Sequence, residues 1–176
     1  YGSIIIPGGA YEAFGLMPGE KLSLTIQPSN QVSDELLECY DIKLSVGDRK
    51  IESLGDNRIL ILIDYENKLN LQEEAIIGVF IDEDGIIHTM PLSYYEEELQ
   101  KVVISTDHLS TFGIKYNLKT FKDTLKHWAK EYIDFLAGRE IVAGIGDGTF
   151  APDQVVTRAE FVKMLSGVVA AELDQY

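Results

Sequence analysis

The sequence predicts a chain in two parts: an all-β, antiparallel, sandwich-like domain at residues 1–118 and a small all-α, helix–loop–helix unit at residues 119–176. Before residue 118, short runs rich in Val, Ile, Thr and aromatic residues recur between turn signals, with no long helical period between them. After it, apolar residues recur three and four positions apart, which is the period of a helix. We therefore expect a domain boundary near residues 117–120.

Several segments of the first part carry the strand signal. They are KLSLTIQ, CYDIKLSVGDRKIESL, RILILI, AIIGVFIDEDGIIHTM, LQKVVIST and STFGIKYN. The first alternates apolar and polar residues, which predicts a strand with one buried face. In the third, Arg58 is followed by five apolar residues, which predicts that residues 59–63 are buried on both faces. Turns at Gly47-Asp48 and Asp84-Gly85 predict hairpins. A short helix is expected at GAYEAFG, and none longer than about three turns is expected within residues 40–110.

Two helices are expected after residue 118. The run HWAKEYIDFLAGREI places Trp128, Tyr132 and Leu136 four residues apart, which predicts one apolar stripe along the first helix. Gly138 suits the left-handed position just after a helix end. The second helix follows the glycine-rich turn VAGIGDGTFAP. Its apolar positions recur at helical spacing and are Phe161, Met164, Leu165 and Val168. The two stripes are expected to pack mainly on each other.

The charge of the chain excludes some classes of partner. The formal net charge is −14, and residues 1–118 hold 8 Lys and Arg against 20 Asp and Glu. Nucleic acid and anionic membranes are bound through clustered Lys and Arg, so we expect neither as a partner. No apolar stretch approaches the roughly 20 residues of a membrane span. Because the chain starts at Tyr1 rather than Met and shows no basic, apolar leader, we expect it to be part of a longer protein.

The sequence predicts no metal site and no cofactor. A single cysteine, Cys39, excludes an internal disulfide framework and a multi-cysteine zinc cluster. Its place in an alternating run predicts a buried, inert thiol. The segment DGTFAPD has carboxylates at Asp147 and Asp153 but lacks the alternating oxygen ligands of a calcium loop. We interpret that segment as a turn.

Residues 121–165 carry a specific resemblance. The segment contains Phe-x-Asp from Phe121, then His-Trp-Ala from His127, then a glycine loop with Asp-Gly-x-Phe-x-Pro, and finally Thr-Arg-Ala-Glu-Phe from Thr157. This order and spacing are similar to an S-layer homology repeat. The resemblance implies a secreted, non-catalytic cell-surface protein of a Gram-positive-type bacterium. Its module would bind secondary cell-wall polysaccharide, often pyruvylated, and would stand among further repeats.

The same resemblance implies candidate polysaccharide-binding residues. They are Arg158, Asp123, Gly144, Trp128 and Glu160. A guanidinium beside the free N–H groups of a helix start makes a good carboxylate receptor, and a pyruvate ketal presents such a carboxylate. The alternative is that Arg158 is a solvated first-turn side chain. Glu160 is expected to close a capping box with Thr157, Trp128 to lie in the core, and Asp123 to brace the first helix.

The N-terminal part also resembles, over about 90 residues, an all-β domain found in S-layer-associated surface proteins. The resemblance rests on CYDIKLSVGDRKI, IGVFIDEDGIIHTM and the final strand from Thr106 to Phe112. The domain is expected to act as a spacer. The alternative is self-processing, in which Ser110 attacks the carbonyl of Leu109 while His108 accepts its proton. A sugar-binding aromatic row is not expected, because the adjacent Tyr94 and Tyr95 point to opposite faces of a strand.

A single repeat leaves exposed the apolar face that neighbouring repeats would otherwise cover. We therefore expect this chain to associate with copies of itself, or to pack its helices back on the β domain.

Overall fold

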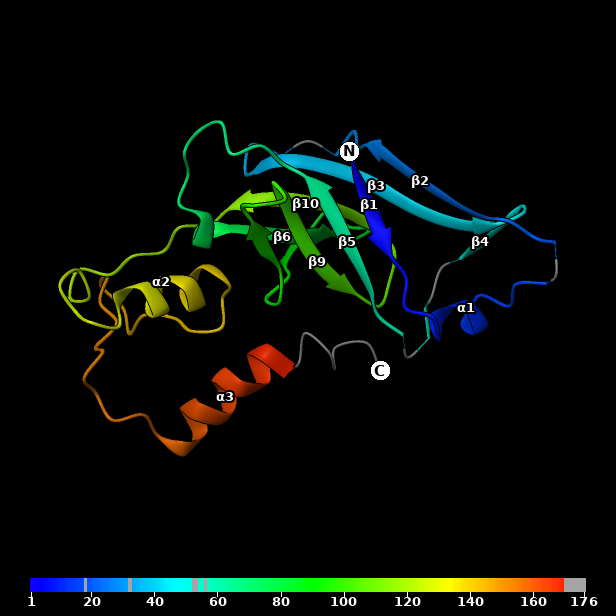
Figure 1. The fold of residues 1–176 in the computed structure, drawn as a ribbon. Coiled ribbons are helices and arrows are strands. Elements are labelled where there is room, and N and C mark those ends of the chain that lie inside the picture. The colour runs from blue at the N-terminus through cyan, green and yellow to red at the C-terminus, as the bar shows by residue number, and fades with distance from the viewer. Residues whose placement is uncertain (18, 32, 52–53, 56, 170–176) are drawn as a thin grey trace.

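The computed structural model describes residues 1–17, 19–31, 33–51, 54–55 and 57–169. Its strands form two antiparallel sheets (Figure 1). The first sheet has the order β1 (Gly2–Ile5), β5 (Ile59–Asp64), β9 (Lys101–Thr106), β8 (Tyr94–Glu96). The second has the order β2 (Leu22–Pro28), β3 (Leu36–Val46), β10 (Thr111–Tyr116), β6 (Ile76–Ile81), β7 (Ile87–Thr89), with β4 (Arg49–Ile51) added to β3.

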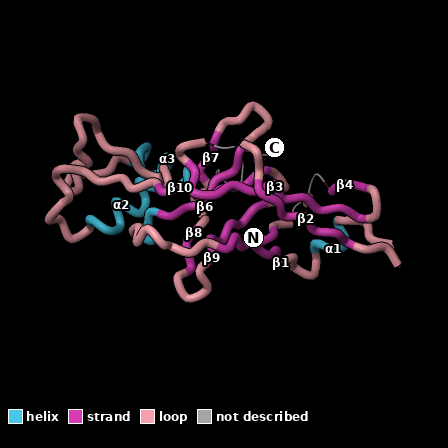
Figure 2. The backbone as a smooth tube through the Cα atoms, turned by 90° about the horizontal axis from the view of Figure 1, so that it is seen from above, coloured by secondary structure: helices cyan, strands magenta, loops and turns pink. Residues whose placement is uncertain are grey.

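Four helical segments accompany the sheets. They are α1 (Ala10–Ala13), the 3-10 turn η1 (Glu73–Ala75), α2 (Lys130–Gly138) and α3 (Arg158–Val169). Figures 1 and 2 show α1 and α2 at opposite ends of the sheets. Among the described residues between 40 and 110, η1 is the only helical segment, so the predicted β-rich first part and helical second part are confirmed.

One hydrophobic cluster joins the two sheets. Its members include Ile42, Leu44, Phe112 and Ile114 of the second sheet and Ile59, Ile61, Ile63 and Ile104 of the first. Along β3 and β5 these side chains alternate with more exposed neighbours, as the period of a half-buried strand requires. In β9 and β10 the neighbours Val103 and Gly113 are buried as well. The core is therefore mainly aliphatic, and both sheets contribute to it.

Strand β5 departs from the sequence prediction of burial on both faces. Ile59, Ile61 and Ile63 are buried, but Leu60 is 36% exposed and Leu62 is partly exposed. A continuous apolar run cannot reveal which face lies against the rest of the protein, since side chains alternate whatever their chemistry. The tertiary structure covers one face of this strand.

The predicted hairpins are confirmed. Strands β3 and β4 are joined across Gly47, which has φ of 57°, and Val46 pairs with Arg49. Strands β6 and β7 are joined by a loop that contains Gly85, which has φ of 80°. In this loop the carboxylate of Asp82 accepts hydrogen bonds from the backbone N–H groups of Asp84 and Ile86, at 3.0 and 2.8 Å. An Asp that binds nearby backbone in this way stabilises the turn.

Cys39 on β3 is half-buried rather than buried. Partial burial raises the pKa of its thiol, and Asp41 raises it further. Because a thiolate is the reactive form, this environment favours the inert thiol that the sequence predicts.

Helix α2 buries a different face from the one predicted. Ile133 and Ala137 are buried, whereas Trp128 lies before the helix with 82% of its surface exposed and Tyr132 is 68% exposed. The predictions that Trp128 lies in the core and that Trp128, Tyr132 and Leu136 form the packed stripe are therefore wrong. The helix lies against η1, and its buried residues are Ile133, Ala137 and Gly138.

Gly138 is required for a reason other than the predicted one. It ends α2 without a positive φ, and the left-handed residue near this helix end is Glu140, with φ of 61°. A Cβ atom on Gly138 would lie 2.7 Å from the backbone oxygen of Asn117. Glycine therefore lets the helix end approach the chain that follows β10.

Helix α3 is largely exposed. Phe161 is 61% and Leu165 52% exposed, while Met164 and Val168 are partly exposed. The expectation that the two helical stripes pack mainly on each other is therefore wrong: α2 packs toward the β part. None of the helices in the described part of the chain has the length and apolar character needed to cross a membrane.

Candidate functional site

Asp123 fixes the glycine-rich loop between the two helices. Its carboxylate accepts hydrogen bonds from the backbone N–H of Phe150 at 2.9 Å and of Ala151 at 2.7 Å. Desolvation alone would raise the pKa of Asp123, but these backbone hydrogen bonds lower it below its usual value. The prediction that Asp123 braces the first helix is therefore corrected: it braces the loop. Ala151, with φ of 60°, needs such support because a non-glycine residue rarely adopts that conformation.

Gly144 lies where the loop and the preceding segment meet. A Cβ atom at this position would lie 2.5 Å from the backbone oxygen of Thr149 and 2.6 Å from the ring of Phe121. The Phe121 ring also packs on Phe150, with ring centroids 5.2 Å apart. Gly144 is therefore needed for close packing of the loop.

The predicted capping box at the start of α3 is present. The backbone N–H and the hydroxyl of Thr157 donate to one carboxylate oxygen of Glu160 at 2.8 and 2.7 Å, and the backbone N–H of Glu160 lies 3.2 Å from the Thr157 hydroxyl. The backbone and side-chain hydrogen bonds from Thr157 lower the pKa of Glu160. Both side chains are thus occupied in starting the helix.

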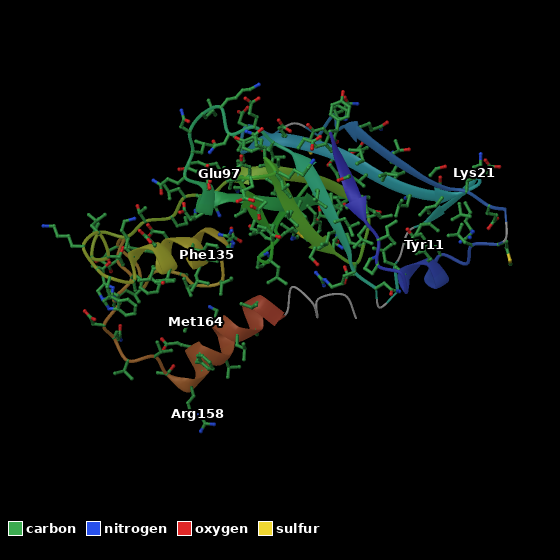
Figure 3. All side chains as sticks on the ribbon, viewed as in Figure 1. Tyr11, Lys21, Glu97, Phe135, Arg158 and Met164 are labelled. Atoms are coloured by element: carbon green, nitrogen blue, oxygen red, sulfur yellow. The ribbon has the colours of Figure 1, made fainter. Side chains whose placement is uncertain are left out.

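Arg158 is exposed on the first turn of α3, and Figure 3 shows its side chain pointing out from the helix. Among the described residues it makes no side-chain hydrogen bond or ion pair. It borders a shallow depression with Val156, Phe161 and Val162. A planar guanidinium that is free to turn toward solvent can bind a carboxylate with two parallel hydrogen bonds.

Trp128 is the second exposed candidate. Its ring lies 5.5 Å from that of His127, measured between centroids. His127 is held in place, because its Nδ1 accepts a hydrogen bond from the backbone N–H of Ala129 at 3.2 Å and its Nε2 lies 3.3 Å from a carboxylate oxygen of Asp153. The exposed indole therefore extends from an ordered segment, and an exposed aromatic face is a suitable platform for a sugar ring.

A groove between the loop and α3 contains residues that the sequence analysis did not select. Gly144 and Glu160 line it, together with Ile145 and Lys163. Lys163 lies one turn after the capping box, and nothing in its local pattern distinguishes it from an ordinary solvated lysine. Only the fold of the loop over α3 brings it to the groove.

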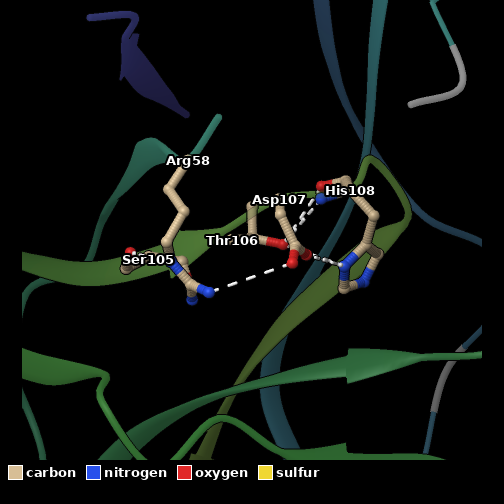
Figure 4. Close-up of polar contacts among 5 residues, drawn as sticks. All are labelled: Arg58, Ser105, Thr106, Asp107 and His108. Carbon is tan, nitrogen blue, oxygen red and sulfur yellow. Dashed lines mark hydrogen bonds and ion pairs between the residues drawn. The ribbon is translucent and has the colours of Figure 1, made fainter. Parts of the chain in front are cut away.

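Ser110 and His108, the residues of the self-processing alternative, both have structural contacts, and Figure 4 shows those around His108. The Ser110 hydroxyl donates to the backbone oxygen of Ile81 at 2.9 Å. Nδ1 of His108 lies 3.1 Å from the Thr106 hydroxyl and 3.2 Å from a carboxylate oxygen of Asp107, and Arg58 approaches that aspartate at 3.9 Å. These contacts hold the turn between β9 and β10, and they give no support to self-cleavage. In the described part of the chain, no group of His, Cys, Asp and Glu has a metal-binding arrangement.

The lowered carboxyl pKa values predict that acid loosens the loop. A carboxyl with a lowered pKa in the folded state stabilises that state above its ordinary pKa, 3.8 for Asp123, and the stabilisation is lost as the pH falls through the folded-state value. After correction for the intrinsic exchange rate, we expect the amide protons of Phe150 and Ala151 to lose protection as the pH falls below about 4 and through the lowered pKa of Asp123. Hydrogen-exchange NMR measures the protection of these two amides. In the control variant Asp123→Asn, the protection should no longer depend on pH in this range. Protection that increases on acidification would contradict the assignment.

This segment combines a braced loop with a capped helix and leaves the side chains of Arg158 and Trp128 exposed. The family model of the S-layer homology domain matches residues 120–162. The prediction of an S-layer homology repeat in this segment is therefore confirmed. S-layer homology domains in general are non-catalytic modules that bind cell-wall polysaccharides, and the match supports an anchoring role at the cell surface for this segment.

Three curated relatives match part of the chain. It is 39% identical to an amylopullulanase of Thermoanaerobacterium thermosulfurigenes over 64 residues, which are 36% of this chain and 3% of the relative. It is 42% identical to endo-1,4-beta-xylanase A of Thermoanaerobacterium saccharolyticum over 57 residues, 32% of this chain and 5% of the relative. It is 38% identical to exoglucanase XynX of Acetivibrio thermocellus over 64 residues, 36% of this chain and 6% of the relative. The chain thus spans only a small fraction of each relative. No solved structure matches it.

Proposed function

We propose that this chain is the junction of a secreted surface protein, in which a β spacer is followed by an S-layer homology repeat that binds pyruvylated secondary cell-wall polysaccharide. The observation that carries the proposal is the exposed Arg158 beside the capped start of α3, within the segment that matches the family. A carboxylate near a helix N-terminus is favoured by the helix dipole as well as by the guanidinium.

The five candidate residues divide into two roles in this proposal. Arg158 and Trp128 are exposed and would contact the polysaccharide directly. Asp123, Gly144 and Glu160 are already engaged with the protein and would hold the loop and the helix start in position. A binding geometry fixed before the ligand arrives lowers the entropic cost of binding.

Residues 1–118 would form the spacer, with the domain boundary near residues 117–120. The shared core of the two sheets supports a sandwich-like arrangement of this part, and its resemblance to an all-β domain of surface proteins supports the role. We assign no catalytic role to this part. Its acidic charge is compatible with a position outside the cell.

Further repeats in the parent protein, or copies of this chain, would cover the exposed side of α3. Phe161, Val162 and Leu165 are each more than half exposed and form a contiguous apolar stretch of this helix. Apolar surface of this kind on a repeat is typically buried by the next repeat.

The ketal group provides the test of the proposed ligand. In a chain that carries three such repeats, we expect strong binding to pyruvylated wall polysaccharide and a loss of about tenfold or more once mild acid has removed the pyruvate. Isothermal titration calorimetry with the same polysaccharide before and after the treatment measures the difference. Equal affinity for both forms would show that the repeat recognises another part of the polymer.

A further inference from the structure

The contact between α2 and the β part contains a buried arginine. Arg139, just after the helix, is 2% exposed and is the largest of the fully buried side chains. One terminal nitrogen of its guanidinium donates to the backbone oxygens of Glu74 at 2.7 Å and Phe135 at 3.2 Å, and the other donates to the backbone oxygen of Ser93 at 3.2 Å. Its charge also lies 3.6 Å above the Phe135 ring.

These contacts join three separate parts of the chain. Glu74 belongs to η1, which directly precedes β6, and Ser93 directly precedes β8, whereas Phe135 belongs to α2. Burial lowers the pKa of Arg139 to about 10, so its side chain remains charged at neutral pH. A buried charge is costly unless its hydrogen-bonding groups are satisfied, and here backbone carbonyls from both parts satisfy them. The guanidinium is stable in this position only while the repeat lies on the β part.

A second contact lies beside the first. The Asn117 side chain donates to the backbone oxygen of Gly138 at 2.6 Å, and its backbone N–H donates to the backbone oxygen of Ala75 at 2.8 Å. Asn117 is itself 6% exposed. A Cβ atom on Gly138 would lie 2.7 Å from the backbone oxygen of Asn117, so the end of α2 and the segment after β10 are in close backbone contact.

We propose that the β domain is the docking platform of the S-layer homology repeat, and that Arg139 locks the repeat in one orientation on it. The platform consists of η1, the residues before β8, and Asn117. Helix α2 lies against η1 with Ile133 and Ala137 buried, whereas Trp128 and Tyr132 stay exposed. In addition to acting as a spacer, the β domain packs against helix α2 and sets the direction in which the exposed surface of the repeat faces.

Residual dipolar couplings measured by NMR on the whole chain test the platform. The strands and residues 121–169 are expected to fit one common alignment tensor in the unaltered chain, because a rigid joint moves as one body. In Arg139→Met, the carbonyls of Glu74 and Ser93 lose their donor, and we expect separate tensors with helix α2 still formed. Lys130→Met is the matched control, since it removes a cation from the same helix whose described ion pair is with Asp134 inside the helix. This variant should keep the common tensor.

A second variant addresses the platform side in case Arg139→Met does not fold. Asn117→Ala leaves every residue of α2 in place and removes only the side-chain hydrogen bond to Gly138. We expect amide exchange in α2 to become roughly tenfold faster while exchange in β5 and β9 stays unchanged. Two tensors in the unaltered chain, or unchanged α2 exchange in Asn117→Ala, would overturn the proposal.

Discussion

Replacing Phe112 by Ala is expected to lower the free energy of unfolding of the β part by about 3–5 kcal/mol. Phe112 is fully buried, and its β10 position pairs with Tyr40 on β3 and Phe80 on β6. Removing the ring leaves a cavity in the cluster that both sheets share, and neighbouring strands cannot collapse into it without breaking their register. Urea denaturation followed by far-ultraviolet circular dichroism measures the loss.

Phe161→Ala is the matched control for this substitution. The same ring is removed, but from a position on α3 that is 61% exposed. Surface substitutions usually change stability by about 0.5 kcal/mol or less, and Ala is a strong helix former. A loss at Phe161 as large as that at Phe112 would show that α3 is covered in solution, by a second copy of the chain for example.

The substitution Arg158→Ala is expected to weaken binding to pyruvylated polysaccharide by about 1.5–3 kcal/mol, in a chain that carries three repeats. The corresponding increase in Kd is roughly tenfold to 150-fold. The reason is the loss of a charge-assisted hydrogen bond to the ketal carboxylate. Calorimetry at two salt concentrations checks the mechanism, because added salt should weaken the unaltered chain more than the variant.

Thr157→Ala separates a loss of contact from a loss of folding. Thr157 makes both reciprocal hydrogen bonds of the capping box, so its replacement should cost about 1 kcal/mol of stability. Arg158→Ala should leave stability nearly unchanged, since the described structure shows no side-chain partner for Arg158. If Arg158→Ala unfolds the repeat, or binds as tightly as the unaltered chain, the receptor role of Arg158 is wrong.

Local chemistry made much of the candidate site predictable. The capping box depends on two side chains three residues apart and on their own backbone, so Thr157 and Glu160 reveal it directly in the sequence. The hairpin at Gly85 is local in the same way. The sequence points to Asp123 but not to its partner, because Asp123 and Phe150 are 27 positions apart and only the folded loop brings them together.

The sequence by itself determined most of the elements: the longer strands, the start of α3, and the segment that matches the S-layer homology family. These depend on period, turn residues and caps, which act within a few positions of the chain. It did not reveal the short strands β1 and β8. The tertiary structure alone decided which faces are covered. It exposed Trp128, buried Arg139 and left Leu60 on the outer side of β5, because burial depends on the neighbour that an element meets, and that neighbour is distant in sequence.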